Sequence, residues 1–324
     1  MLMRIRQRAV GVRLDHGWRR PTPILPLRCQ AAESCHGSRN PPRRCFTLRD
    51  HFQSGVKMEA ERLAAQVGAA RAYQSLFVPA LFARWADLVA QAAKLSDGEQ
   101  VLDVACGTGV LAAAAAERVG ASGRVCGVDS NPGMLQVAAE LHPQIDWRQA
   151  DAAELPFDDA SFDAVLCQFG LMFFPDQGRA IAEMRRVLKP GGRLVIAVWN
   201  ALEYNPAYAM LVALLRREAG EPAAAALSAP FACGDRCALY GLVDDAGFSA
   251  VVCQSPAGQA RFPSVRSVVE AELLGWLPLM GVELSEAASA RLVDLASEEM
   301  KVFEQASGEA HFPLSAHLIS ARRD

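Results

Sequence analysis

The sequence predicts an α/β fold with a mostly parallel, doubly wound sheet, and three observations support this prediction. From Met58 onward, short apolar runs of strand length alternate with stretches whose apolar residues recur at helical spacing. The run VLDVACGTGV, residues 101–110, reads as a buried strand that ends in a glycine-rich turn. The run RLVIAVW, residues 193–199, is apolar throughout, which is typical of a strand in the middle of a sheet.

Repeated strand–helix–strand units favour a parallel sheet with helices on both faces. The helix predicted at 178–189 should stop there, because the turn-forming residues Pro190, Gly191 and Gly192 follow it. The expected strands are 101–105, 124–128, 145–149, 163–168, 193–199, 248–254 and 314–322. The expected helices are 59–70, 76–94, 111–119, 132–141, 178–189, 238–248 and a long helical stretch over about 264–306.

Residues 1–57 differ from the rest of the chain in composition. They hold 12 Lys and Arg residues against 3 acidic ones, whereas residues 58–324 carry a net charge of −12. The acidic body argues against binding to a phosphate backbone, so no nucleic-acid partner is expected. For the basic segment three interpretations remain open: a disordered or non-native extension, an organelle transit peptide, or a nucleic-acid-binding arm. The first is favoured, which leaves residues 58–324 as the functional domain.

Composition also limits the class of protein. No charge-free apolar run approaches the roughly 20 residues that a membrane span requires, so we expect no span and a cytoplasmic location, or a mitochondrial one if residues 1–57 are a transit peptide. The nine cysteines are scattered, and buried reduced thiols explain them best. Cys233 and Cys237 have the spacing of half a metal site, but no second pair accompanies them, and we expect no metal.

The glycine-rich turn predicts a nucleoside-containing ligand, since ligands of open α/β sheets bind at the carboxyl ends of the strands. Gly107 and Gly109 allow positive φ and close approach of the backbone to a ligand. Asp129, at the end of the next strand, is placed to accept hydrogen bonds from a ribose. These features fit NAD as well as other adenosine ligands. Asp103 favours the second group, because it would repel a pyrophosphate but attract the ammonium and sulfonium of S-adenosylmethionine.

Four blocks, in order, resemble the class I S-adenosylmethionine-dependent methyltransferases, in the group of the ubiquinone/menaquinone C-methyltransferases. They are VLDVACGTG, VCGVDSNPGML, ADAAELPFDDASFDAVLCQFGLMFFPD and EMRRVLKPGGRLVIAVW. The resemblance is strong over residues 95–200 and looser over 58–322. It implies a Rossmann-like sheet of seven strands, with an antiparallel last strand and a helical insertion before it, and S-adenosylmethionine as the cofactor.

The resemblance also implies roles for individual residues. The first strand and its turn would hold the methionine part of the cofactor, Asp129 the ribose, Asp151 the adenine amine, and Gln168 would lie near the reacting methyl. Asp129 has an alternative role as a helix cap before Pro132, and Asp151 as the cap of a turn. The implied site residues are Tyr73, Asp103, Cys106, Gly107, Thr108, Gly109, Asp129, Ser130, Met134, Asp151, Ala152 and Gln168.

The methyl acceptor should be determined by residues 200–235 and 255–312, where the resemblance fades. Their apolar pieces indicate a small apolar or aromatic acceptor. No catalytic residue is assigned, because a base is needed only if the acceptor must lose a proton; His311 and His317 are the candidates, and a structural role is favoured for both. An S-adenosylmethionine-binding protein without turnover and an NAD-linked oxidoreductase remain as alternatives to a methyltransferase.

Overall fold

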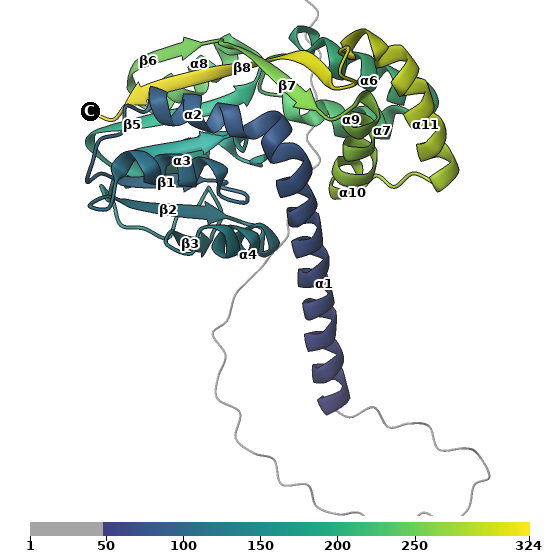
Figure 1. Ribbon diagram of the computed structural model, residues 1–324. Coiled ribbons are helices and arrows are strands. Elements are labelled where there is room, and N and C mark those ends of the chain that lie inside the picture. The colour runs from purple at the N-terminus through teal and green to yellow at the C-terminus, as the bar shows by residue number, and fades with distance from the viewer. Residues whose placement is uncertain (1–47) are drawn as a thin grey trace, which may run out of the picture. The chain divides into compact units, whose positions relative to one another are not determined.

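The computed structural model describes residues 48–324, with side chains described from Met58 onward. An eight-stranded sheet forms the centre of this part of the chain (Figure 1). The strands lie in the order β3-β2-β1-β4-β5-β8-β6, and β7 pairs with β8. The strands are β1 (Gln100–Val104), β2 (Arg124–Asp129), β3 (Asp146–Gln149), β4 (Phe162–Gln168), β5 (Leu188–Trp199), β6 (Ser249–Gln254), β7 (Ala257–Phe262) and β8 (Ala310–Arg322).

The pairing directions confirm the predicted fold class. Strands β1 to β5 pair in parallel with one another. The last strand, β8, runs antiparallel to β5, β6 and β7. Because the parallel strands all end at the same edge of the sheet, the turn after β1 lies beside the ends of β2 and β4, where the sequence places the ligand.

Helices cover both faces of the sheet. Helices α2 and α3 pack against one face through Trp85, Val89 and Leu111, and α5 and α8 pack against the other through Ile181 and Val243. The α-helices are α1 (Leu48–Phe77), α2 (Ala83–Ala92), α3 (Val110–Val119), α4 (Pro132–Leu141), α5 (Gln177–Val187), α6 (Pro206–Glu218), α7 (Glu221–Ser228), α8 (Arg236–Asp245), α9 (Val265–Glu270), α10 (Leu277–Leu279) and α11 (Glu286–Glu299). Two π-helical segments are η1 (Val78–Phe82) and η5 (Ala271–Trp276).

The sequence did not predict strand β7. Its residues, AGQARF, include no β-branched side chain, so their β-propensity is low. The strand forms because it pairs with the first half of β8, which begins at Ala310 rather than at the expected residue 314. The expected sheet of seven strands therefore has an eighth, and the helical insertion begins only after β7.

The turn between α5 and β5 is tighter than expected. Helix α5 ends at Val187, and β5 starts at once with Leu188, which pairs with Phe162. The next pair joins Ala164 to Arg193, so the four residues between Leu188 and Arg193 bulge out of the ladder. Gly191, at φ 78°, allows this bulge, and its N–H donates to the Arg323 carbonyl at 2.6 Å.

Helices α6, α7, α9, α10 and α11 gather into one cluster beside β7 (Figure 1). A buried hydrogen-bonded pair lies inside it: the Tyr208 hydroxyl of α6 donates to Glu272 Oε1 of η5 at 2.9 Å. Glu272 is 3% exposed; burial raises its pKa and the hydrogen bond from Tyr208 lowers it in part, with a net pKa of about 7. The insertion expected over 264–306 is thus helical, with a break before Glu286.

Helix α1 is longer than expected. It begins at Leu48, so residues 48–57 of the expected leader are helical, while residues 1–47 lie outside the described part of the chain. Helix α1 passes through η1 into α2, where two separate helices were expected. Within the described residues, no helix has the length and apolar character needed to cross a membrane.

Candidate active site

The turn after β1 adopts a conformation that most residues avoid. Ala105, Gly107 and Gly109 have φ angles of 58°, 54° and 91°. For Ala105 this left-handed conformation costs about 1–2 kcal/mol, and such strain is typical of functional sites. A Cβ on Gly109 would lie 2.5 Å from the Trp147 ring, so glycine is required there for space as well as for conformation. The turn is held by two backbone hydrogen bonds, from Cys106 N to the Val128 carbonyl and from Gly109 N to the Cys106 carbonyl.

Asp103 lies on β1 just before this turn and is 1% exposed. Neither of its carboxylate oxygens has a hydrogen-bond partner among the described residues. Burial raises its pKa well above the usual value, and the charge of Asp129 raises it further. The Ala112 backbone N–H at the start of α3 lies close enough to lower this pKa in part, but it does not meet the geometry of a hydrogen bond to either oxygen. Burial raises the pKa of Tyr73 and of the Cys106 thiol, and the negative charges of Asp129 and Asp103 raise both further. Asp103 therefore shares one electrostatic environment with the turn.

Asp129 ends β2 and joins two turns together. Its Oδ2 accepts from Gly107 N at 2.9 Å and its Oδ1 accepts from Asn131 N at 2.8 Å. Burial raises its pKa, and the N–H groups of Asn131, Gly107 and Ser130 lower it in part. The alternative that Asp129 caps the following helix is wrong, because the Asn131 side chain caps α4 by accepting from Gly133 N and Met134 N. The predicted ribose contact of Asp129 remains a proposal.

Gln168 ends β4, the strand that neighbours β1. Its Nε2 donates to the Phe82 carbonyl of η1 at 3.3 Å, while its Oε1 is buried without a partner in the described structure. Residue Phe169, which follows, has φ 54°, so the chain also leaves β4 in a left-handed conformation. Asp103 pairs with Leu166 across the two strands, two residues before Gln168. Because side chains alternate along a strand, Asp103 and Gln168 project from the same face.

Three buried acceptor atoms thus lie on one face of adjacent strand ends: Asp103 Oδ1, Asp103 Oδ2 and Gln168 Oε1. An unpaired buried carboxylate is costly unless a cation or donor satisfies it. A primary ammonium offers three donors and a positive charge, and so fits this set. A phosphate would add negative charge to it. These residues are therefore suited to the amino-acid end of S-adenosylmethionine.

The predicted adenine-side residues lie after β2 and β3, with Met134 in the first turn of α4 and the others in loops. Asp151 is exposed, and its Oδ1 accepts from Ala153 N at 2.8 Å, so it does close a turn, as the alternative interpretation held. Ala152 and Met134 are half-buried and Ser130 is exposed. All four follow the carboxyl ends of neighbouring parallel strands, on the side predicted for adenosine.

Helix α1 lies against the glycine turn. The Tyr73 ring is near Gly107, since a Cβ there would be 3.9 Å from the Tyr73 hydroxyl. The Thr108 side chain is buried, and its Oγ1 donates to Gln74 Oε1 at 2.5 Å, so this hydroxyl anchors α1. Arg71 also pairs with Glu140 of α4 at 3.0 Å. The sequence indicated Tyr73 by resemblance, but it gave no signal for Gln74.

An aromatic cluster follows the ends of β4 and β5. Phe169 and Trp199 stack with their ring centroids 3.7 Å apart, and Phe82 contacts both rings. Tyr73 stacks on Phe82 at 5.2 Å and so connects the cluster to the glycine turn. Phe169 belongs to the third of the four sequence blocks, but the sequence did not predict that η1 would bring Phe82 to it. Phe169 and Trp199 are buried, so the partly exposed rings of this cluster are Tyr73 and Phe82.

The candidate histidines have structural partners. His317 is buried, with Nε2 2.9 Å from the Gly234 carbonyl and Nδ1 2.8 Å from Ser255 Oγ. His311 lies 3.5 Å from Glu309. The favoured structural role therefore fits both residues, and neither is proposed as a base.

Comparison with known proteins supplies the deciding observation. Residues 102–196 match the family model described as "Methyltransferase domain". The chain carries a methyltransferase domain. Its match runs from Leu102 of β1 to Ile196 of β5, and therefore contains the glycine turn, Asp129 and Gln168. The resemblance to class I S-adenosylmethionine-dependent methyltransferases is thereby confirmed.

Curated relatives match this methyltransferase domain and its surroundings. The chain is 40% identical to the chloroplastic 2-phytyl-1,4-beta-naphthoquinone methyltransferase of Arabidopsis thaliana, over 36% of this chain and 48% of the relative. It is 43% identical to the demethylmenaquinone methyltransferase of Renibacterium salmoninarum, over 38% of this chain and 51% of that protein. The chain thus spans about half the length of these relatives.

Solved structures share the fold. The YcgJ protein of Bacillus subtilis is 21% identical, with a TM-score of 0.50 over 74% of this chain and 97% of that one. The phosphoethanolamine N-methyltransferase 2 of Haemonchus contortus, solved in complex with S-adenosyl-L-methionine, is 17% identical, with a TM-score of 0.50 over 78% of this chain and 56% of that one. These structures show that the fold is shared, and the family match supports S-adenosylmethionine as the cofactor of the methyltransferase domain.

Proposed function

We propose that this protein transfers a methyl group from S-adenosylmethionine to a small apolar acceptor of the quinol type. The observation that carries the proposal is the unpaired buried carboxylate of Asp103, with Gln168 Oε1 beside it, at the glycine turn of a methyltransferase domain. These atoms would hold the ammonium of the cofactor. Asp129 would accept from the ribose, and Asp151 from the adenine amine.

S-adenosylmethionine supplies an electrophilic methyl carbon: its bond to sulfur breaks as the bond to the acceptor forms, S-adenosylhomocysteine leaves, and the acceptor releases one proton. The residues described above contribute by binding and orientation, because an in-line displacement depends mainly on holding donor and acceptor at near-attack distance. The cluster of Tyr73, Phe82, Phe169 and Trp199 would exclude water from this position.

Two observations support a quinol-type acceptor. The two curated relatives are named for a naphthoquinone and for demethylmenaquinone. At the aromatic cluster, the partly exposed rings of Tyr73 and Phe82 are the ones against which a flat, apolar ring would pack. A quinol activates its own ring carbon by losing a hydroxyl proton, so the chemistry does not require a strong base on the protein.

The test is methyl transfer by the full chain. S-adenosylmethionine with an isotopically labelled methyl group is incubated with reduced naphthoquinones, phenols, amines and fatty acids, and S-adenosylhomocysteine release and label transfer are both measured. We expect the label in the reduced naphthoquinones. Label only in charged acceptors would contradict the acceptor class. Tight binding of S-adenosylmethionine without transfer to any acceptor would contradict an enzyme.

A further inference from the structure

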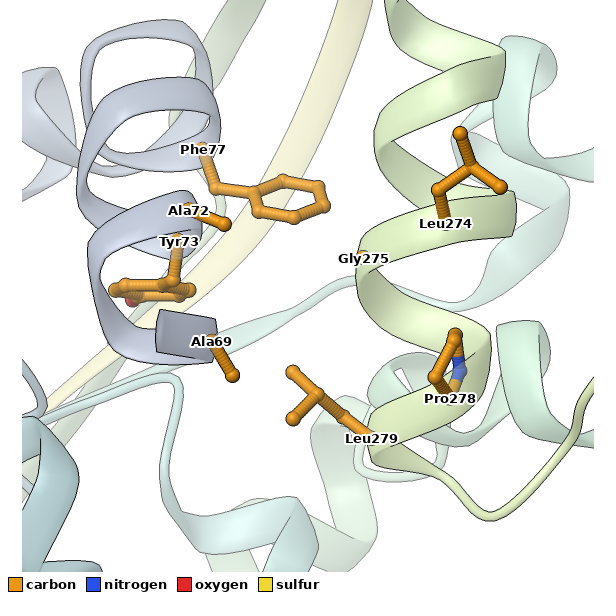
Figure 2. Close-up of a pocket in the computed structure, with 8 residues that line it drawn as sticks. All are labelled: Ala69, Ala72, Tyr73, Phe77, Leu274, Gly275, Pro278 and Leu279. Atoms are coloured by element: carbon orange, nitrogen blue, oxygen red, sulfur yellow. The ribbon is translucent and has the colours of Figure 1, made fainter. Parts of the chain in front are cut away.

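An apolar groove lies between α1 and the segment formed by η5 and α10, outside the residues that match the family model. It has a volume of about 190 Å³. Figure 2 shows Phe77 of α1 pointing across the groove toward Gly275, and Leu279 pointing back toward Ala69. The Tyr73 hydroxyl is the one polar side-chain group on its walls, as far as the described residues show.

The groove and the candidate active site share a wall. Tyr73 lines the groove, and its ring also lies 3.9 Å from the place that a Cβ on Gly107 of the glycine turn would take. From Tyr73 the aromatic contacts run to Phe77 at 6.1 Å within the groove, and to Phe82 at 5.2 Å toward the ends of β4 and β5. A ligand held at the aromatic cluster would therefore have an apolar route past Tyr73 into the groove.

The outer end of the groove is apolar and open to solvent. Leu274 is 65% exposed and Leu279 is 45% exposed, and both line it. Exposed apolar side chains that lie together at the mouth of a pocket are a feature of ligand-binding grooves. Water in the groove finds few hydrogen-bond partners on these walls, so its replacement by a hydrocarbon is favourable.

We propose that this groove binds a hydrocarbon chain of the methyl acceptor, with the ring of the acceptor at the aromatic cluster. The proposal rests on the proposed function and adds a second recognition element to it. Because a cavity of about 150 Å³ holds a benzene molecule, the groove holds a chain of about eight carbons. Carbons beyond that number pass between Leu274 and Leu279 into solvent.

Gly275 keeps the groove open. A Cβ at this position would lie 3.4 Å and 3.8 Å from two Phe77 ring atoms, which is close to ordinary contact, so alanine fits and leucine fills the space. Gly275 is not among the residues with positive φ, so a side chain causes no backbone strain. Gly241, in helix α8 on the opposite side of the sheet, provides a matched control, because a Cβ there would have no neighbouring atom within 4 Å.

The experiment uses the full chain saturated with S-adenosylhomocysteine. The dissociation constants of 2-alkyl-1,4-naphthoquinones, with chains from about two to about sixteen carbons, are measured by calorimetry alongside those of n-alkanols of the same chain lengths. For the wild type we expect the dissociation constant to fall about two- to fourfold per methylene up to about eight carbons, and little beyond that. Gly275→Leu should abolish this dependence on chain length, and Gly275→Ala should end it at a shorter chain. Gly241→Leu should retain it in full.

Several outcomes would overturn the proposal that the groove binds a hydrocarbon chain. One is that Gly275→Leu keeps the wild-type dependence of the dissociation constant on chain length. Another is that Gly275→Leu changes the dissociation constants of the alkanols but not those of the naphthoquinones. A change of oligomeric state in Gly275→Leu, without loss of chain-length dependence, would make the groove an interface between copies. Failure of the proposed function is separate: it would appear as chain-dependent binding without methyl transfer.

Discussion

Replacement of Asp103 by asparagine separates the role of the charge from the role of the shape. Asparagine has nearly the same size, so the packing around β1 is preserved. In the wild type the carboxylate is 1% exposed and unpaired, and burial raises its pKa. Because the pKa of Asp103 is higher in the folded than in the unfolded chain, the free energy of unfolding falls as the pH rises above the pKa of the unfolded state. Asp103→Asn should therefore leave the unliganded protein as stable as the wild type or more stable, with the largest gain at the highest pH.

The same change should weaken cofactor binding. A hydrogen bond to a charged group contributes about 1.5–3 kcal/mol, which corresponds to a loss of about 10- to 150-fold in affinity for S-adenosylmethionine. Binding of a cation also favours the ionised carboxylate. Wild-type affinity should consequently fall as the pH is lowered through the raised pKa of Asp103, and Asp103→Asn should remove this fall.

Calorimetric titration with two ligands makes the assay specific. S-adenosylmethionine carries the amino-acid part, whereas methylthioadenosine lacks it, so only the first should bind Asp103→Asn more weakly. Asp87→Asn is the control, because that carboxylate is 71% exposed and pairs with Arg118 away from the turn. Equal losses for both ligands, or no loss for S-adenosylmethionine, would refute the assignment of Asp103 to the ammonium.

Three further predictions concern positions with a defined structural reason. Asp129→Ala removes the acceptor of two backbone N–H groups, so it should lower the free energy of unfolding by about 1–3 kcal/mol as well as weaken cofactor binding, as denaturant unfolding and calorimetry can show. Gly191→Ala should lower the free energy of unfolding by about 1 kcal/mol, and Gly109→Ala by more, because only the Gly109 variant pushes a methyl group into the Trp147 ring. Equal midpoints of urea unfolding for the two variants would contradict this. Glu272 stays protonated in the folded protein up to about pH 7, so stability should fall by on the order of 3 kcal/mol as the pH rises from about 4.5 to about 7, and a Glu272→Gln variant that retains this slope would refute the assignment.

The sequence predicted best those elements whose signals are local. Helix α4 has the predicted bounds, 132–141, because the cap of Asn131 and the following Pro132 fix its start. Strand β7 was missed because tertiary pairing with β8, rather than β-propensity, holds it in place. The start of α1 was misplaced because residues 48–57 show no clear apolar periodicity.

The sequence predicted the site residues that belong to the strand ends, but not those that the helices above the strands contribute. Asp103 and Gly107 belong to one sequence block and Asp129 to the next, so their neighbourhood follows from the parallel pairing of β1 with β2. Gln74 and Phe82 reach the site only because α1 and η1 pass over the strand ends, and no motif marks that crossing. The bonds that Asp129 makes to two turns were likewise not predictable, because they depend on backbone N–H directions.

The central claim is that a cationic nucleoside–amino-acid conjugate occupies the turn after β1. A crystal structure of the full chain with S-adenosylhomocysteine tests it most directly. We expect the amino group within hydrogen-bonding distance of Asp103 or Gln168, directly or through one water, and the ribose on Asp129. A complex in which the ligand lies elsewhere, with the Asp103 carboxylate still unpaired, would contradict the account.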